Sequence, residues 1–121
     1  MAQTVVVLER DPNLARSIAG ELRPHFSVHV THTREEMRDN VSQIRPGAVV
    51  LNIEASHLAD VALLHQDFPE LPIVCTHRVP DEEMWMAALE AGAIDVCPVD
   101  DVRNVLTSVL RSTGASGSAA A

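Results

Sequence analysis

The chain has 121 residues and a formal net charge of −8 at pH 7, and 46% of its residues are apolar. This length fits one domain with its own core, and no apolar run is long enough to cross a bilayer. The acidic residues are spread along the chain and no basic stripe stands out, so we expect neither direct nucleic-acid binding nor a membrane segment. The start of the chain lacks the basic and apolar stretches of a secretory signal, so we expect a cytoplasmic protein.

The predicted elements alternate between strand and helix from the N-terminus. Thr4–Leu8 is an apolar, β-branched run, which is typical of a strand buried on both faces. Asp11 and Pro12 then predict a helix that ends before Pro24, because aspartate caps a helix and proline fits its first turn. Phe26–Val30 alternates apolar and polar residues, which indicates a half-exposed strand near a sheet edge.

The same alternation continues to the end of the chain. Thr33 and Glu36 have the spacing of a capping box and predict the start of the second helix. The later predicted elements are a strand at Ala48–Ile53, a helix at His57–Phe68, a strand at Ile73–Thr76, a helix from Asp81 to Ala91, a strand at Ile94–Cys97 and a helix capped by Asp101.

Repeated strand–helix units predict an α/β domain over residues 1–112. Its expected architecture is a five-stranded parallel sheet with helices on both faces, a flavodoxin-like three-layer sandwich. Residues 113–121 are rich in glycine, serine and alanine, which predicts a flexible tail or the start of a linker.

The residues that follow the strands are the candidates for a functional site, because sites on such sheets lie beyond the carboxyl ends of the strands. In chain order these candidates are Glu9, Arg10, Asp11, Asn52, Glu54, Thr76, His77, Cys97 and Val99.

Neither the cysteines nor the histidines form a recognisable cofactor motif. Cys75 and Cys97 are interpreted as small buried side chains, with a redox pair on neighbouring strands as the alternative. The six histidines show no zinc-site spacing, and no glycine-rich phosphate loop is present. We therefore expect no metal and no cofactor.

Three segments carry a resemblance to a known family. VVVLERDPNLARSIAGEL, RPGAVVLNIEA and ALEAGAIDV resemble, in this order, the first strand and helix, the third strand, and the fourth helix and fifth strand of the receiver domains of two-component response regulators. The Ala-Gly-Ala turn is the most specific of these pieces, and the resemblance runs to about Arg111. It implies a signalling domain, which in this family is switched by transfer of a phosphoryl group to an aspartate in the presence of Mg²⁺.

The chain departs from this family where the chemistry takes place. Asn52 falls at the position of the nucleophilic aspartate, and an amide is neither a nucleophile nor a charged metal ligand. Glu9 and Arg10 fall at the two acidic positions that hold Mg²⁺, so a permanent cation stands where a metal ligand is needed. Asp11 is the acid that could replace it, although it is also the predicted helix cap.

Two further family positions are ambiguous in this sequence. The hydroxyl position falls on His77 by counting back from the Ala-Gly-Ala turn, or on Thr76 with a shift of one residue. The lysine position falls on Val99 by spacing, or on Cys97 if Cys-Pro matches the family's Lys-Pro, and the chain contains no lysine. Phosphorylation by the family mechanism is therefore expected to be absent. We expect Arg10 either to fill the metal site and pair with Glu54 or Glu9, or to point into solvent.

The resemblance also implies a working surface. The family docks partners or dimerises through its fourth helix, fifth strand and fifth helix, which here carry Met84, Trp85, Leu89, Asp101 and Arg103. Trp85 is interpreted either as a binding anchor or as a side chain folded over the core edge. The favoured function is a non-enzymatic module that binds a protein partner or forms a homodimer in signal transduction. The alternatives are a phosphorelay switch that uses an unconventional acid, and a small-molecule sensor.

Overall fold

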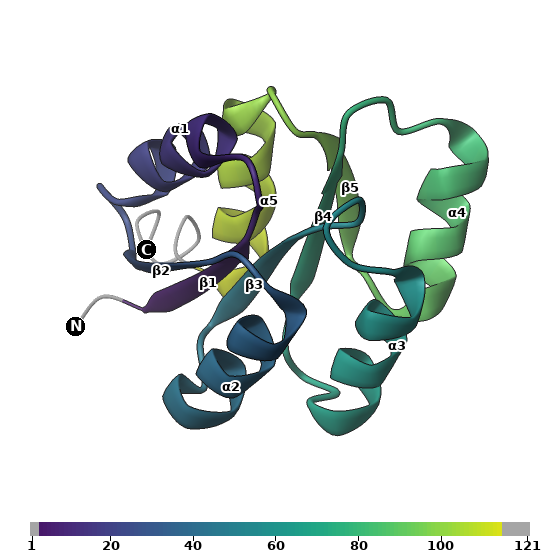
Figure 1. Ribbon diagram of the computed structural model, residues 1–121, viewed down its shortest axis with the longest axis horizontal. Coiled ribbons are helices and arrows are strands. Elements are labelled where there is room, and N and C mark those ends of the chain that lie inside the picture. Colours follow the sequence, from purple (N-terminus) through teal and green to yellow (C-terminus); the bar gives the residue numbers. More distant parts are fainter. Residues whose placement is uncertain (1–2, 115–121) are drawn as a thin grey trace.

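A computed structural model describes residues 3–114 of the chain, in which five strands alternate with five helices (Figure 1). The strands are β1 (Thr4–Leu8), β2 (Ser27–Thr31), β3 (Ala48–Asn52), β4 (Ile73–His77) and β5 (Asp95–Pro98). The helices are α1 (Pro12–Leu22), α2 (Arg34–Ile44), α3 (Leu58–Asp67), α4 (Glu82–Ala91) and α5 (Val102–Thr113). No helix in this part of the chain is long and apolar enough to cross a membrane.

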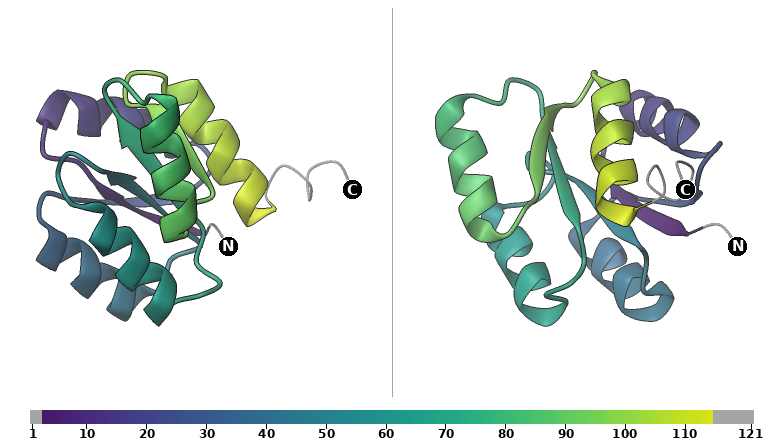
Figure 2. Two further views of the ribbon diagram at one scale, coloured as in Figure 1. Left: turned by 90° about the vertical axis from the view of Figure 1, so that its right-hand side faces the viewer. Right: turned by 180° about the vertical axis from the view of Figure 1, so that it is seen from behind.

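All five strands lie in one parallel sheet with the order β2-β1-β3-β4-β5. Helices α1 and α5 cover one face, and α2, α3 and α4 cover the other (Figure 2). The predicted three-layer α/β architecture is therefore confirmed. The alternating Phe26–Val30 segment was expected near an edge, and β2 is the edge strand beside β1.

Each face of the sheet has its own apolar core, because successive residues of a strand point to opposite sides. In β1, Val5 and Val7 pack with α1 and α5, whereas Val6 and Leu8 pack with α2, α3 and α4. The continuous apolar run predicted a strand buried on both faces, and all four of these side chains are buried.

The helix starts follow the capping residues that the sequence indicates. Asp11 accepts hydrogen bonds from the backbone N–H groups of Asn13 (2.8 Å) and Leu14 (3.3 Å) at the start of α1. Thr33 accepts from the N–H of Glu36 at the start of α2. The predicted capping box is only half formed there, because the Glu36 carboxylate accepts from the N–H of His32 instead of that of Thr33.

The ends of the last elements differ slightly from prediction. Strand β4 continues to His77 and β5 to Pro98, because these two residues are partners in the parallel ladder. Helix α5 continues to Thr113, and Gly114 closes it with φ 75°, a left-handed conformation that glycine adopts without strain. Residues 115–121 of the predicted tail lie outside the described residues.

Gly92 marks a close approach between α3 and the turn that follows α4. Its φ is 120°, and a Cβ atom added there would lie 2.5 Å from Cγ of His65. Glycine is therefore required at this point of the Ala-Gly-Ala turn by both backbone conformation and space.

The two cysteines lie on neighbouring strands but on opposite faces of the sheet. Cys75 packs in the core beneath α2, α3 and α4, and Cys97 packs in the core beneath α1 and α5. The redox-pair alternative is therefore wrong, since the sheet itself separates the two sulfur atoms, and both thiols are free. Burial raises the pKa of the Cys75 thiol to about 12, and the nearby Cys97 adds to this rise.

The environment of Cys97 is more polar than that of Cys75. Burial raises the pKa of the Cys97 thiol to about 11, although a hydrogen bond with Ser108 opposes the rise and the carboxylate of Asp95 adds to it. At neutral pH both residues are therefore thiols and not thiolates.

We predict that neither cysteine is alkylated by iodoacetamide in the folded protein at pH 8. Less than about one in a thousand of either thiol is ionised at that pH, and both are buried. Mass spectrometry should find both cysteines labelled after unfolding in urea and neither labelled before it. Rapid labelling of one cysteine in the native protein would contradict the burial described here.

Candidate functional site

A pocket of about 270 Å³ lies at the carboxyl ends of β1 and β3. It is lined by Glu9, Arg10, Asp11, Leu14, Asn52, Glu54, Ala55 and Arg78. Five of the candidates from the strand ends are therefore brought together, namely Glu9, Arg10, Asp11, Asn52 and Glu54.

The centre of the pocket is a hydrogen bond between two buried side chains. The amide Nδ2 of Asn52 donates to Oε1 of Glu9 over 2.6 Å, and the two residues are 5% and 3% exposed. The backbone N–H of Asp11 donates to Oε2 of Glu9 over 3.0 Å. Both oxygens of this buried carboxylate therefore have a donor, which offsets the cost of removing the group from water.

The other half of the Asn52 amide is also occupied. Its Oδ1 accepts from the backbone N–H of Glu54 over 2.7 Å, so the amide joins the end of β3 to the following loop. A carboxylate at this position could accept the bond from Glu54, but it could not donate to Glu9. The surroundings of the Asn52 side chain therefore suit an amide, which can both donate and accept, and not a carboxylate.

Asp11 is placed by the helix that follows it. One of its oxygens, Oδ1, accepts from the first-turn N–H groups of α1, so the predicted capping role is the one the structure shows. This contact leaves Asp11 at the exposed rim of the pocket.

The expected pairing of Arg10 with a carboxylate is wrong. Arg10 is exposed, and no carboxylate in residues 3–114 lies within 4.0 Å of its guanidinium group. The reason is that both expected partners already have donors: Glu9 is bound to Asn52 and the backbone, and Glu54 is bound to Arg78. Arg10 lines the pocket at its rim instead.

Arg78 is the residue that the sequence analysis missed. Its Nε lies 3.1 Å from Oε2 of Glu54, and its backbone N–H donates to Oε1 of the same carboxylate over 3.1 Å. The contact joins the loop after β3 to the loop after β4. A signal was present, because Arg78 is the first residue after β4, but the candidates taken from this strand end were Thr76 and His77.

The pKa of the Glu54 carboxyl reflects this contact. Partial burial raises the pKa, but the backbone and side-chain hydrogen bonds from Arg78, its positive charge and the nearby His77 together lower it below the ordinary value of 4.5. Glu54 therefore stays ionised at neutral pH, paired with a cation of the same chain.

The remaining strand-end candidates do not line the pocket. Thr76 is buried, and its hydroxyl oxygen has no hydrogen-bond partner among the described residues. Nδ1 of His77 accepts from the N–H of Val79 over 3.0 Å, and Val99 is buried and donates its N–H to the carbonyl of His77. Cys97 is buried in the core beneath α1 and α5. Neither candidate for the lysine position therefore provides a polar group to the site.

No three His, Cys, Asp or Glu side chains gather into a possible metal site within residues 3–114. Glu9 is the one buried carboxylate of the pocket, and both of its oxygens accept hydrogen bonds. A cation approaching Glu9 would compete with the Asn52 amide and the backbone N–H for these oxygens.

The predicted interaction surface is divided between exposed and packed side chains. Trp85 is 44% exposed on α4, whereas Met84 packs against the core and Leu89 is half-buried. Asp101 caps α5 by accepting from the N–H of Asn104 over 3.3 Å. Arg103 is exposed. Trp85 is thus partly available for contact and is not folded fully over the core edge.

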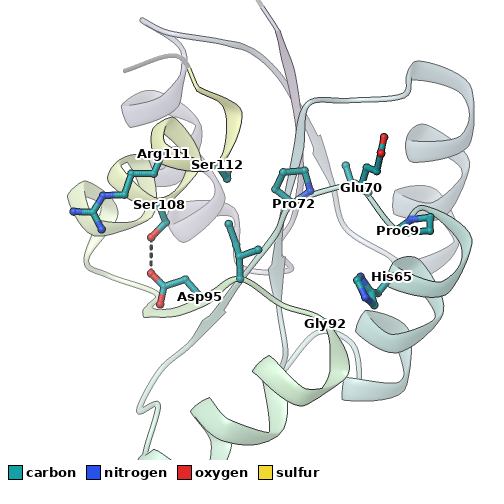
Figure 3. Close-up of a pocket in the computed structure, with 11 residues that line it drawn as sticks. His65, Pro69, Glu70, Pro72, Gly92, Asp95, Ser108, Arg111 and Ser112 are labelled. Carbon is teal, nitrogen blue, oxygen red and sulfur yellow. Dashed lines mark hydrogen bonds between the residues drawn. The ribbon is translucent and has the colours of Figure 1, made fainter. Parts of the chain in front are cut away.

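A second pocket, of about 410 Å³, lies at the opposite end of the sheet, where β4 and β5 begin (Figure 3). In it the hydroxyl of Ser108 on α5 donates to Oδ2 of Asp95 on β5 over 2.5 Å. Figure 3 shows Arg111 directed away from this pair and His65 across the pocket on α3. The Asp95–Ser108 bond fastens α5 to the edge strand β5.

Comparison with known proteins identifies the fold. No protein-family model and no curated protein matches the sequence. Among solved structures, a putative response regulator from Chloroflexus aurantiacus superposes with a TM-score of 0.85 at 18% identity, covering 94% of this chain and 99% of that one. A BeF3-activated DrrB receiver domain gives a TM-score of 0.84 at 20% identity, with the same coverage of both chains.

A response regulator from Thermotoga maritima gives a TM-score of 0.84 at 16% identity, covering 94% of this chain and 99% of that one. At these identities the likeness is one of structure. The chain has the fold of response-regulator receiver domains.

Proposed function

We propose that this chain is a receiver-like signalling module that acts by binding protein, without catalysis and without phosphorylation of the residue at the end of β3. The observation that carries the proposal is the hydrogen bond from Asn52 to Glu9. An amide occupies the nucleophile position of the fold. Its N–H donates to the carboxylate of Glu9, which would otherwise be a metal ligand.

Two further features support the loss of phosphoryl transfer. Arg10 stands at the second acidic position, where it brings a positive charge in place of a metal ligand, and solvent screens this charge because the side chain is exposed. The lysine position is filled by Val99 or Cys97, and the sequence has no lysine to replace it. A phosphoryl group entering this pocket would find neither a nucleophile nor a metal that neutralises its charge.

The proposed contact surface is formed by α4, β5 and α5. A tryptophan that is 44% exposed is a large apolar group in contact with water, and tryptophan is enriched among residues that dominate binding. Met86, on the same helix, is 50% exposed and adds a flexible apolar side chain beside it. These exposed apolar side chains support binding of a protein partner or of a second copy of the chain.

A second candidate function is binding of a small molecule in the strand-end pocket. The pocket of about 270 Å³ favours it, since the volume suits a small polar compound. The lining carries both carboxylate and guanidinium groups, so such a compound would bear both charges.

We predict that millimolar Mg²⁺, with or without beryllofluoride as a mimic of the phosphoryl group, leaves the amide chemical shifts of Glu9, Asn52 and His77 unchanged. The physical reason is that the oxygens of Glu9 already accept hydrogen bonds, while Asn52 and Arg10 supply no carboxylate to a metal ion. Saturable shifts at these residues would show that the pocket still accepts metal and phosphoryl, and the phosphorelay alternative would replace the proposal.

The matched control restores the missing acids. The double variant Arg10→Asp/Asn52→Asp places a carboxylate at each of positions 9, 10 and 52, and it should show Mg²⁺-dependent shifts at the same amides. If the double variant is also silent, the shifts of the native chain cannot report on metal binding, and Tb³⁺ luminescence of both proteins decides the matter instead.

We predict that Arg78→Ala raises the pKa of the Glu54 carboxyl, because it removes the side-chain hydrogen bond and the positive charge that lower it. Carboxyl ¹³C shifts followed against pH measure this directly. Since the folded pKa lies below the unfolded value, the Glu54–Arg78 contact stabilises the native chain above about pH 4.5 and is lost as the pH falls through the folded pKa. Arg111→Ala, a change at an exposed arginine elsewhere, should leave the titration of Glu54 unchanged.

We predict that Trp85→Ala weakens partner binding or self-association by about 2 kcal/mol, roughly 30-fold in Kd. The free energy of unfolding should change by less than about 1 kcal/mol, since alanine favours the helix and Trp85 is partly exposed. Analytical ultracentrifugation and titration calorimetry measure the two effects. Leu63→Ala on α3 is the control, because Leu63 is equally exposed at 45%. Equal effects of the two variants would exclude this surface.

A further inference from the structure

The outer edge of the sheet beside α1 combines three features that the proposed function does not use. The first is an uncovered strand edge. The N–H of Ser27 donates to the carbonyl of Gln3, and the carbonyl of Thr31 accepts from the N–H of Glu9, so these residues of β2 face β1. Alternation along the strand directs the N–H and C=O groups of Val28 and Val30 to the free side, where no described residue pairs with them.

The second feature is an apolar floor. Val28 and Val30 point toward the α1 side of the sheet but are only half-buried, unlike the valines of β1. A groove of about 230 Å³ opens there between α1 and β2, and its base includes Val30 with Ala15 and Ala19 of α1. The small alanine side chains keep this groove open along the helix.

The third feature is a cationic wall. Arg16 of α1 and Arg23, the residue that caps the end of α1, line the groove about two helical turns apart, about 10 Å along the axis, and His32 also lines it. Both arginines are exposed, and no carboxylate in the described part of the chain lies within 4.0 Å of either. Three other arginines, at positions 34, 38 and 78, do pair with carboxylates. Two cations of an acidic protein thus face an open groove without a counter-ion of their own.

We propose that this edge binds an extended acidic segment of a partner protein by adding it as a strand beside β2. The backbone of the segment would pair with Val28 and Val30, and its alternate side chains would point to the α1 side of the sheet. Carboxylates on that side would meet Arg16 and Arg23, while apolar side chains cover the exposed flank of the two valines. Charge complementarity selects an acidic partner, and the sheet edge selects an extended one.

The groove is separate from the α4–β5–α5 surface, so the two proposals fail independently. The test uses the full ¹⁵N-labelled chain and a short synthetic peptide in which every second residue is in turn glutamate or valine, with threonine between them, so that both kinds of side chain fall on one face of the added strand. Saturable amide shifts are expected at Val28, Val30, Arg16 and Arg23. Slower hydrogen exchange is expected for the amides of Val28 and Val30, which ion pairing alone would not produce. The double variant Arg16→Ala/Arg23→Ala should weaken binding roughly three- to tenfold, the range for two exposed ion pairs, and raised salt should act in the same direction.

The controls decide between strand addition and other causes. Arg111→Ala removes an exposed arginine on α5 and should leave peptide binding unchanged. A peptide with lysine in place of glutamate should not bind. The proposal is overturned if Val28 and Val30 gain no protection, if the double variant binds the peptide as well as the native chain does, or if inorganic phosphate of equal charge produces the same shifts. The last result would assign the groove to small anions.

Discussion

A buried carboxylate must be given hydrogen-bond donors, and the strand ends of this protein are arranged around that requirement. Glu9 ends β1 almost out of contact with water, and its two oxygens are met by the Asn52 amide and the Asp11 N–H. The same Asn52 amide accepts from the N–H of Glu54. One side chain thus holds the ends of β1 and β3 together and fixes where the next loop begins.

The loop after β3 is held in turn by an ion pair with the loop after β4. Glu54 receives two hydrogen bonds from Arg78, one from the backbone and one from the side chain, and this joins the loops after β3 and β4. Arg78 is 75% exposed, so its charge is screened and the contact orients the loop more than it stabilises the fold. Both loops are thus held by groups of the chain itself.

The fold could be predicted from the sequence because it depends on patterns that a short window reveals. The valine run of β1, the caps at Asp11 and Thr33, and the alternation in β2 each report on a local preference. The first three were found at the expected residues, and β2 lies one residue later than predicted, at Ser27–Thr31. The strand ends that differed, at His77 and Pro98, depend on each other across the sheet and are invisible to a local pattern.

The site was less predictable, because it depends on which way side chains point. Arg10 and Glu54 follow two strands of one parallel sheet, which predicted that they lie close together. They do line one pocket, but the partner of Glu54 is Arg78. Glu54 could pair with Arg10 or with Arg78, and the choice between them follows from the path of the loop after β4. Similarly, Cys75 and Cys97 lie on adjacent strands, and only the register shows that they face opposite cores.

The close approach at Gly92 restricts which substitutions the chain can accept at positions 92 and 65. An alanine there would meet two separate penalties, a backbone conformation that L-residues avoid and a collision with His65 on another helix. A smaller side chain at position 65 would not remove the second penalty, because the Cβ atom of residue 65 would itself lie 2.6 Å from the added Cβ. Positions 92 and 65 are therefore coupled in one direction: the histidine can be exchanged freely while glycine is kept, but glycine cannot be lost. Substitutions in the last turn of α3 are thus permitted by a residue that lies outside α3.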